Sequence, residues 1–209
     1  TTARLLKEET PILAFSKTYQ APLNIMHEFG HCNAIMSGGE SASIDIEETH
    51  SQANELMFAT YLRNTYPEDN FLKAFYEMAI NDAANGLFKT AYVADCELYL
   101  FENYSTLNKE ELKEGLHNIY LQYPSVFDEN YWTASVISST GYYISYTTSV
   151  IEALLLGAKA SENFDMAKKN FNKLVFGDRS LDDVSFWKAA GLSSPFEQST
   201  IDAVKRILG

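Results

Sequence analysis

The chain has 209 residues, 46% hydrophobic and 13% aromatic, which is enough for a globular protein with a well-buried core. Its 16 basic and 28 acidic residues give a net charge of −12, which argues against nucleic acid or an anionic membrane as a partner. No stretch approaches the roughly 18 apolar residues of a membrane span, and residues 1–10 lack the apolar segment of a signal peptide. The two cysteines, Cys32 and Cys96, cannot build a disulfide framework, so we predict a reduced, cytoplasmic setting.

The N-terminal part combines one predicted strand with a predicted helix. Residues 3–9 favour a short helix or an ordered linker. The apolar run Pro11–Ser16, bounded by proline and by polar residues, predicts a short strand. From residue 21 or 22 to about Met36, apolar residues lie on more than one side of a helix, as is typical of a helix buried in the interior. The Ser-Gly-Gly sequence that follows ends this helix.

The rest of the chain favours helices throughout. Apolar spacing and helix-end signals predict helices over about 46–66, 68–105 (one helix, or two with a break at Gly86), 108–123, 140–159, 165–174, 181–190 and 195–208. Between two of these, residues 127–132 form a looser aromatic segment. No repeat, low-complexity tract or Pro-rich linker divides the sequence. We therefore predict a single all-α domain over residues 1–209, with at most a short N-terminal strand.

The first long helix carries the sequence His27-Glu-Phe-Gly-His31. Two histidines four residues apart project from one helix face and can bind a single metal ion. The intervening Glu28 is the residue type that serves as general base in zinc peptidases with this spacing. Catalytic zinc usually has three protein ligands and one position for water, so a third ligand is expected elsewhere. Cys32 projects from a different face and is not expected to bind the metal.

The next predicted helix offers several possible third ligands, namely Glu47, Glu48, His50 and Glu55. Glu48 and Glu55 are seven residues apart and therefore share one helix face. One of them could bind the metal while the other orients a ligand histidine. Glutamates on a helix are often merely solvated, so the residues alone leave the choice of ligand open.

Three stretches follow one another along the chain: His27–His31, residues 48–55 (Glu-Thr-His-Ser-Gln-Ala-Asn-Glu) and residues 141–146 (Gly-Tyr-Tyr-Ile-Ser-Tyr). Together they resemble the zinc helix, the third-ligand helix and the late tyrosine segment of the thimet oligopeptidase and oligoendopeptidase F family of zinc metallopeptidases. Residues 94–97 (Ala-Asp-Cys-Glu) are more distantly similar to an Ala-Glu-Phe-Glu stretch of the oligoendopeptidase branch. The resemblance covers most of the chain, from Pro11 to the C-terminus.

This resemblance implies a helical zincin-type catalytic domain that binds one Zn²⁺ per chain. It implies His27, His31 and Glu48 as the metal ligands, with Glu55 orienting a ligand histidine. His50 is then a neighbour on the ligand helix and not a ligand.

The resemblance also implies a zinc-dependent endopeptidase that hydrolyses short peptides. Glu28 would take a proton from the zinc-bound water and pass it to the leaving amine. Tyr142 and Tyr146, four residues apart on one side of a helix, would donate to the oxyanion. Most of the 13 tyrosines are expected to be packing residues, and Tyr143 is a weaker candidate than these two.

Two departures from the family bear on the active site and the channel. A family histidine that precedes the tyrosines is absent from residues 132–141, and the residue near Ile137 that replaces it is not identified by the sequence. Family members also carry several hundred residues before the zinc helix. We therefore expect this chain to be the C-terminal catalytic part of a longer oligopeptidase, or to need an N-terminal portion or second chain that completes the peptide channel.

Two other functions compete with an active peptidase. One is a catalytically weak or inactive fragment of the same fold that binds a peptide or a partner chain. Glu28 argues against it, because a binding protein needs no general base beside a metal. The other is a helical structural domain in which the motifs occur by chance.

Overall fold

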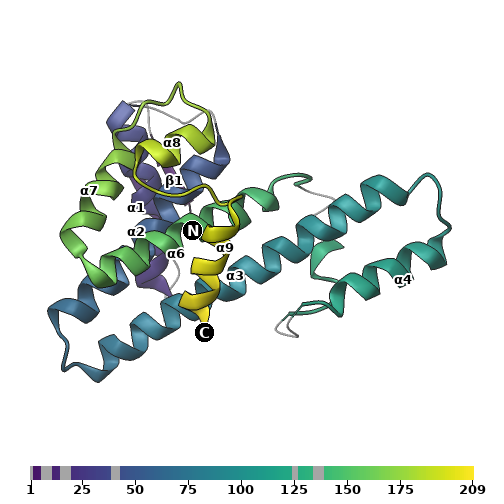
Figure 1. The fold of residues 1–209 in the computed structure, drawn as a ribbon, viewed down its shortest axis with the longest axis horizontal. Coiled ribbons are helices and arrows are strands. Elements are labelled where there is room, and N and C mark those ends of the chain that lie inside the picture. Colours follow the sequence, from purple (N-terminus) through teal and green to yellow (C-terminus); the bar gives the residue numbers. More distant parts are fainter. Residues whose placement is uncertain (1, 6–10, 15–19, 39–42, 124–126, 134–138) are drawn as a thin grey trace. The chain divides into compact units, whose positions relative to one another are not determined.

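The computed structural model describes residues 2–5, 11–14, 20–38, 43–123, 127–133 and 139–209 (Figure 1). Its elements are β1 (Thr2–Leu5), β2 (Pro11–Ala14), α1 (Ala21–Gly38), α2 (Ile44–Thr65), α3 (Asn70–Asn103), α4 (Lys109–Tyr120), α6 (Tyr143–Glu162), α7 (Phe164–Val175), α8 (Asp183–Ala189) and α9 (Gln198–Leu208). The predicted helical fold class is thus confirmed. Among the described residues, no helix is both long and apolar enough to cross a membrane.

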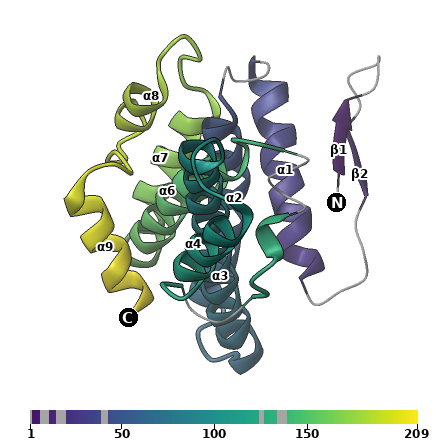
Figure 2. The same ribbon diagram turned by 90° about the vertical axis from the view of Figure 1, so that its right-hand side faces the viewer.

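The two short strands form an antiparallel pair beside α1 (Figure 2). Thr2 lies opposite Ala14, and Leu5 lies opposite Pro11. The strand predicted at Pro11–Ser16 is confirmed for its first four residues, and the remaining two lie outside the described part. The helix or linker expected over residues 3–9 is wrong for 3–5, which belong to β1. A segment this short is a marginal helix in isolation, whereas pairing with β2 supplies backbone hydrogen bonds.

The chain divides into two compact units. The first consists of residues 1–83 and 148–209, and the second of residues 84–147. Both boundaries fall inside helices, α3 and α6, so the sequence carries no linker that would mark them. The prediction of one catalytic domain over the whole chain stays a prediction.

In the first unit, α2 is surrounded by α1, α7 and α8 (Figure 1). His50 on α2 is fully buried and its Nε2–H donates to the carbonyl oxygen of Leu174 on α7, at 2.5 Å. Trp187 on α8, also fully buried, donates its indole N–H to Thr49 Oγ1 at 3.2 Å. These hydrogen bonds link two buried residues of α2 to α7 and α8.

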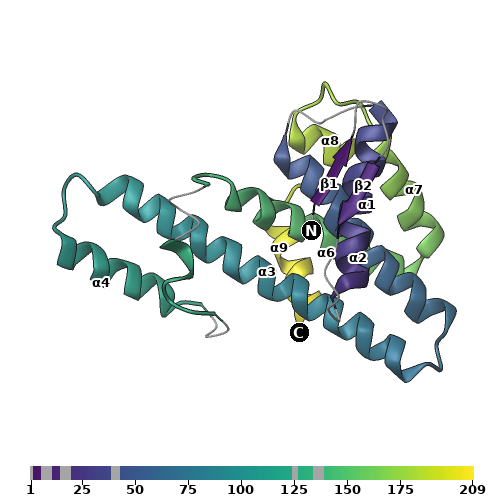
Figure 3. The same ribbon diagram turned by 180° about the vertical axis from the view of Figure 1, so that it is seen from behind.

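In the second unit, the C-terminal part of α3 and the antiparallel α4 lie side by side (Figure 3). Asn108 caps α4 in a capping box with Glu111, as the polar start of this helix predicts. The core of this unit is Tyr92, Cys96 and Leu116, packed against Tyr99, Leu100, Ile119, Tyr120, Tyr123, Phe127 and Trp132. Helix α3 continues through Gly86 without a break, because one glycine costs only about 1 kcal/mol in a helix of otherwise good formers.

A buried acid in the first unit makes the stability of the fold dependent on pH. Glu152 on α6 is fully buried, and neither carboxyl oxygen has a hydrogen-bond partner. Burial raises the pKa of Glu152 to about 8; the charge of Lys159 opposes this shift and that of Glu197 adds to it. The folded chain therefore keeps a proton that the unfolded chain releases near its ordinary pKa of 4.5.

We accordingly predict that the contribution of Glu152 to the free energy of unfolding falls as the pH rises from about 4.5 to about 8 and is level above that. The loss is about 1.4 kcal/mol for each unit of pKa shift, so it amounts to several kcal/mol. Glu152→Gln removes this contribution and leaves those of the other titrating groups. Urea unfolding at pH 5 and pH 8 measures the difference between the two proteins. Parallel pH profiles for wild type and variant would contradict the prediction.

Candidate metal centre

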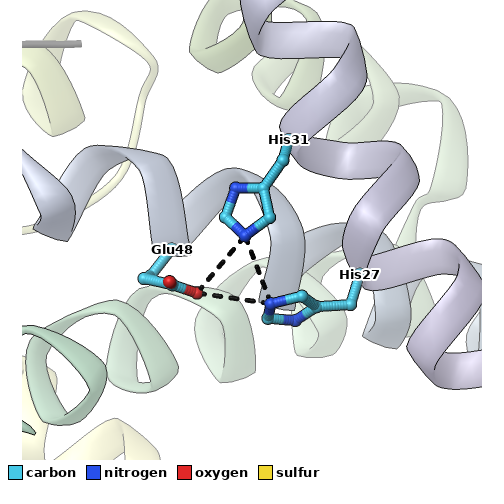
Figure 4. Close-up of side chains that lie close together, drawn as sticks. All are labelled: His27, His31 and Glu48. Atoms are coloured by element: carbon cyan, nitrogen blue, oxygen red, sulfur yellow. Dashed lines mark hydrogen bonds and ion pairs between the residues drawn. The ribbon is translucent and has the colours of Figure 1, made fainter. Parts of the chain in front are cut away.

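Three side chains from two crossing helices converge at one point (Figure 4). His27 and His31 lie one turn apart on α1, and Glu48 lies near the start of α2. His27 Nε2 is 3.2 Å from His31 Nε2 and 3.4 Å from Glu48 Oε2, and His31 Nε2 is 3.7 Å from Glu48 Oε2. The structure thus brings together the three residues that the sequence predicts as metal ligands.

The spacing of these atoms fits a zinc ion. Ligand atoms about 2.0–2.1 Å from a tetrahedral ion are about 3.3–3.4 Å from one another. The three observed distances, 3.2, 3.4 and 3.7 Å, bracket that value. If these atoms bound a tetrahedral zinc ion, the two nitrogens and one carboxylate would leave its fourth position open, which is typical of catalytic rather than structural zinc.

A close helix crossing makes this convergence possible. A Cβ atom at Gly30 would lie 2.6 Å from Ser51 Cα and 2.8 Å from the carbonyl oxygen of His50, which are both backbone atoms of α2. Only glycine permits α1 and α2 to approach so closely. The crossing falls between His27 and His31 on one helix and three residues after Glu48 on the other. The sequence predicted no role for Gly30, although a glycine inside a helix is a signal of close packing.

Hydrogen bonds orient the proposed ligands. His27 Nδ1 is 2.7 Å from Glu55 Oε1, so the imidazole donates to this carboxylate and keeps Nε2 on the side of Glu48. The Ser51 hydroxyl lies 3.1 Å from Glu48 Oε2 and 3.0 Å from the Glu48 carbonyl oxygen. Glu55 thus occupies the orienting position expected for it. Ser51 was not predicted as part of the site, although it follows Glu48 by one helical turn.

The electrostatic field of the site favours a cation. Burial by itself lowers the pKa of His27, but the hydrogen bond and charge of Glu55, with the charges of Glu48 and Glu28, raise it above the ordinary 6.5. Burial and the nearby His27 lower the pKa of His31 to about 4, so His31 is neutral at pH 7, which is the form that binds metals. Burial also raises the pKa of Glu55, while the hydrogen bond to His27 and its charge oppose this shift.

Glu28 is close to the cluster without being part of it. Its side chain is on the helix that carries both histidines, is 8% exposed, and interacts electrostatically with both imidazoles. This placement is compatible with a general base next to the metal. Cys32 is buried, and burial raises the pKa of its thiol, with a further contribution from Glu28. The Cys32 thiol is not among the ligand atoms that converge at His27, His31 and Glu48.

His50, the histidine of the second motif, has a structural partner instead. Its Nε2–H is used in the bond to the carbonyl oxygen of Leu174. Burial lowers the pKa of His50 to about 4, so the ring is neutral. This arrangement agrees with its interpretation as a neighbour of the ligand Glu48.

Tyr142 and Tyr146 form a pair at the start of α6. Their hydroxyl oxygens are 2.8 Å apart and their ring centroids 5.1 Å apart. The four-residue spacing thus places both hydroxyls together, as the sequence suggests. Both residues belong to the second unit and the metal ligands to the first, so their role beside the metal stays a prediction. Ile137 and its neighbours lie outside the described residues.

Comparison with known proteins relates this fold to peptidases. No protein-family model and no curated protein matches the sequence. Among solved structures, Pz peptidase A with an inhibitor shares 20% identity at a TM-score of 0.74, over 97% of this chain and 39% of that one. An oligoendopeptidase F from Bacillus anthracis shares 22% identity at a TM-score of 0.72, over 99% of this chain and 36% of that one. Another oligoendopeptidase F structure shares 19% identity at a TM-score of 0.75, over 95% of this chain and 38% of that one.

The chain therefore has a helical peptidase fold. It is the fold of the oligoendopeptidase F and Pz peptidase structures, which confirms at the level of fold the resemblance inferred from the three motifs. The chain spans less than two fifths of the length of each of these structures.

Proposed function

We propose that this chain is the zinc-binding catalytic part of an endopeptidase that hydrolyses short peptides. The observation that carries the proposal is the convergence of His27, His31 and Glu48 at 3.2–3.7 Å, with Glu28 buried beside them. The peptidase fold supports it independently. A binding module of this fold would have no use for the buried carboxylate of Glu28.

The residues of the chain divide the chemistry among them. The two histidines and Glu48 would hold zinc, which would supply Lewis acidity to polarise the scissile carbonyl and to lower the pKa of a water molecule. Glu28 takes the proton of the attacking water as its oxygen bonds to the carbonyl carbon. When the carbon–nitrogen bond breaks, Glu28 returns the proton to the leaving amine. The Tyr142–Tyr146 pair donates hydrogen bonds to the oxyanion.

The substrate side of the site requires more protein than this chain. The solved structures that share the fold are more than twice as long. We propose that an N-terminal portion or a second chain completes a channel, which admits short unstructured peptides and excludes folded proteins. A cytoplasmic location belongs to the same proposal.

The alternative is a weakly active or inactive fragment that binds a peptide or a partner. The observation that favours it is that the chain spans less than two fifths of the length of each solved structure with this fold. It predicts zinc and peptide binding without turnover.

A hydrolysis assay separates the two functions. The chain is loaded with one equivalent of zinc and given a quenched fluorescent peptide of about ten residues. The assay is run without and with the proposed N-terminal portion added as a separate chain. The proposal predicts cleavage that a chelator abolishes and added zinc restores. Zinc and peptide binding with no cleavage under either condition would contradict the proposed endopeptidase activity and support the inactive binding fragment.

A further inference from the structure

The segment that carries the tyrosine pair is attached to α3 at both of its ends. We call residues 141–147 the tyrosine turn. At its start, the backbone N–H of Gly141 lies 3.2 Å from each carboxylate oxygen of Glu97. At its end, the Thr147 hydroxyl donates to Thr90 Oγ1 at 2.9 Å. Tyr142 and Tyr146 lie between these two attachments.

The two anchors lie on the same side of α3. Thr90 and Glu97 are seven residues apart, which is close to two helical turns or about 10 Å along the axis. The hydroxyl of Thr90 also bonds to the carbonyl oxygen of Gly86, at 3.0 Å, which fixes its rotamer. The anchors and the tyrosine turn all belong to the second compact unit.

The Glu97 contact holds an unusual backbone conformation. Gly141 has a φ of +76°, in the left-handed region, where a residue with a side chain is disfavoured by about 1–2 kcal/mol. A Cβ atom at Gly141 would meet nothing within 4 Å, so the backbone and not the available space selects glycine. Glycine also leaves the chain free to adopt other conformations here. The hydrogen bond from the Gly141 N–H to the carboxylate of Glu97 is stronger than one between neutral groups, and it selects one of these conformations.

We propose that Glu97 is a positioning residue, whose bond to Gly141 holds Tyr142 and Tyr146 together as one pair of hydrogen-bond donors. Thr90 secures the other end of the tyrosine turn. The structural part of this inference stands on the contacts within the second unit. Its catalytic consequence rests on the proposed function.

Nuclear magnetic resonance tests the structural part without any enzyme assay. In the wild type, the Gly141 amide donates to the carboxylate of Glu97, so its resonance is expected to lie downfield of its position in Glu97→Ala. In the same variant, the Cζ resonances of Tyr142 and Tyr146 are expected to shift because the hydroxyl pair separates. Glu102→Ala, an exposed glutamate on the same helix, is the matched control and leaves all three resonances in place. Unchanged tyrosine resonances in Glu97→Ala would overturn the inference.

Kinetics test the catalytic part. Glu97→Ala is expected to lower kcat about tenfold and to change KM less than twofold, while Glu97→Gln, which retains an acceptor, keeps most of the wild-type kcat. Adding Glu97→Ala to Tyr142→Phe is expected to lower kcat by less than a further factor of about two, because both substitutions disturb the same tyrosine pair. Additive effects of the two substitutions would overturn the positioning role. A wild type without activity would instead overturn the proposed function, and the resonances would still decide the structural part.

Discussion

Replacing Glu28 by glutamine is expected to lower kcat for peptide hydrolysis by about 10²–10⁴-fold, while one zinc ion stays bound. Glutamine has nearly the same volume as glutamate, so the buried position beside the two histidines remains filled. It cannot accept a proton from water or deliver one to the leaving amine. The zinc ligands themselves are unchanged, so metal content separates a lost base from a lost metal.

The matched control for this substitution is Glu68→Gln, which alters an exposed glutamate in the α2–α3 connection. Its kcat is expected to equal that of the wild type. Zinc content and hydrolysis rate are measured on the same preparations of all three proteins. A Glu28→Gln variant with a kcat within threefold of the wild type would assign proton transfer to another group.

Gly30→Ala is expected to destabilise the chain by about 3 kcal/mol and to weaken zinc binding at the same time. The added methyl group would lie 2.6 Å from Ser51 Cα and 2.8 Å from the carbonyl oxygen of His50. Both are backbone atoms, so the clash is relieved only if α1 and α2 move apart. Such a movement separates the histidines on α1 from Glu48 on α2.

Gly86→Ala is the matched control for Gly30→Ala, and we expect it to have the opposite effect on stability. Gly86 also lies inside a helix, but a Cβ atom there would meet nothing within 4 Å. Alanine is expected to stabilise α3 by about 0.5–1 kcal/mol and to leave zinc affinity unchanged. Denaturant unfolding and zinc titration of both variants check the pair. Equal effects of the two substitutions would contradict the close crossing at Gly30.

Much of the fold was predictable because long helices repeat their apolar residues many times. The helix expected over residues 46–66 is found as α2 at Ile44–Thr65, and the one expected over 108–123 is α4, Lys109–Tyr120, which Asn108 caps. Residues 3–5 were assigned wrongly, because their strand depends on a partner, β2, that lies outside the local pattern. The possible break at Gly86 did not occur, because the flanking turns of α3 outweigh the cost of one glycine.

Some residues of the site could be predicted from local sequence spacing, and others could not. The spacing of His27 and His31 defines a shared face from local geometry alone. The choice of Glu48 over its acidic neighbours rested on the family resemblance, because it depends on the rotation of α2 against α1. The contact of Gly30 with α2, at Ser51, fixes that rotation, and such long-range contacts are not encoded in helical periodicity.

Zinc titration of the purified chain tests the central claim most directly. We predict one zinc ion per chain in the wild type, no measurable binding in His27→Ala, and affinity lowered about 10–100-fold in Glu55→Gln, which keeps the ligands but loses the charged acceptor for His27. Zinc binding by His27→Ala with the affinity of the wild type would contradict a metal centre built from His27, His31 and Glu48.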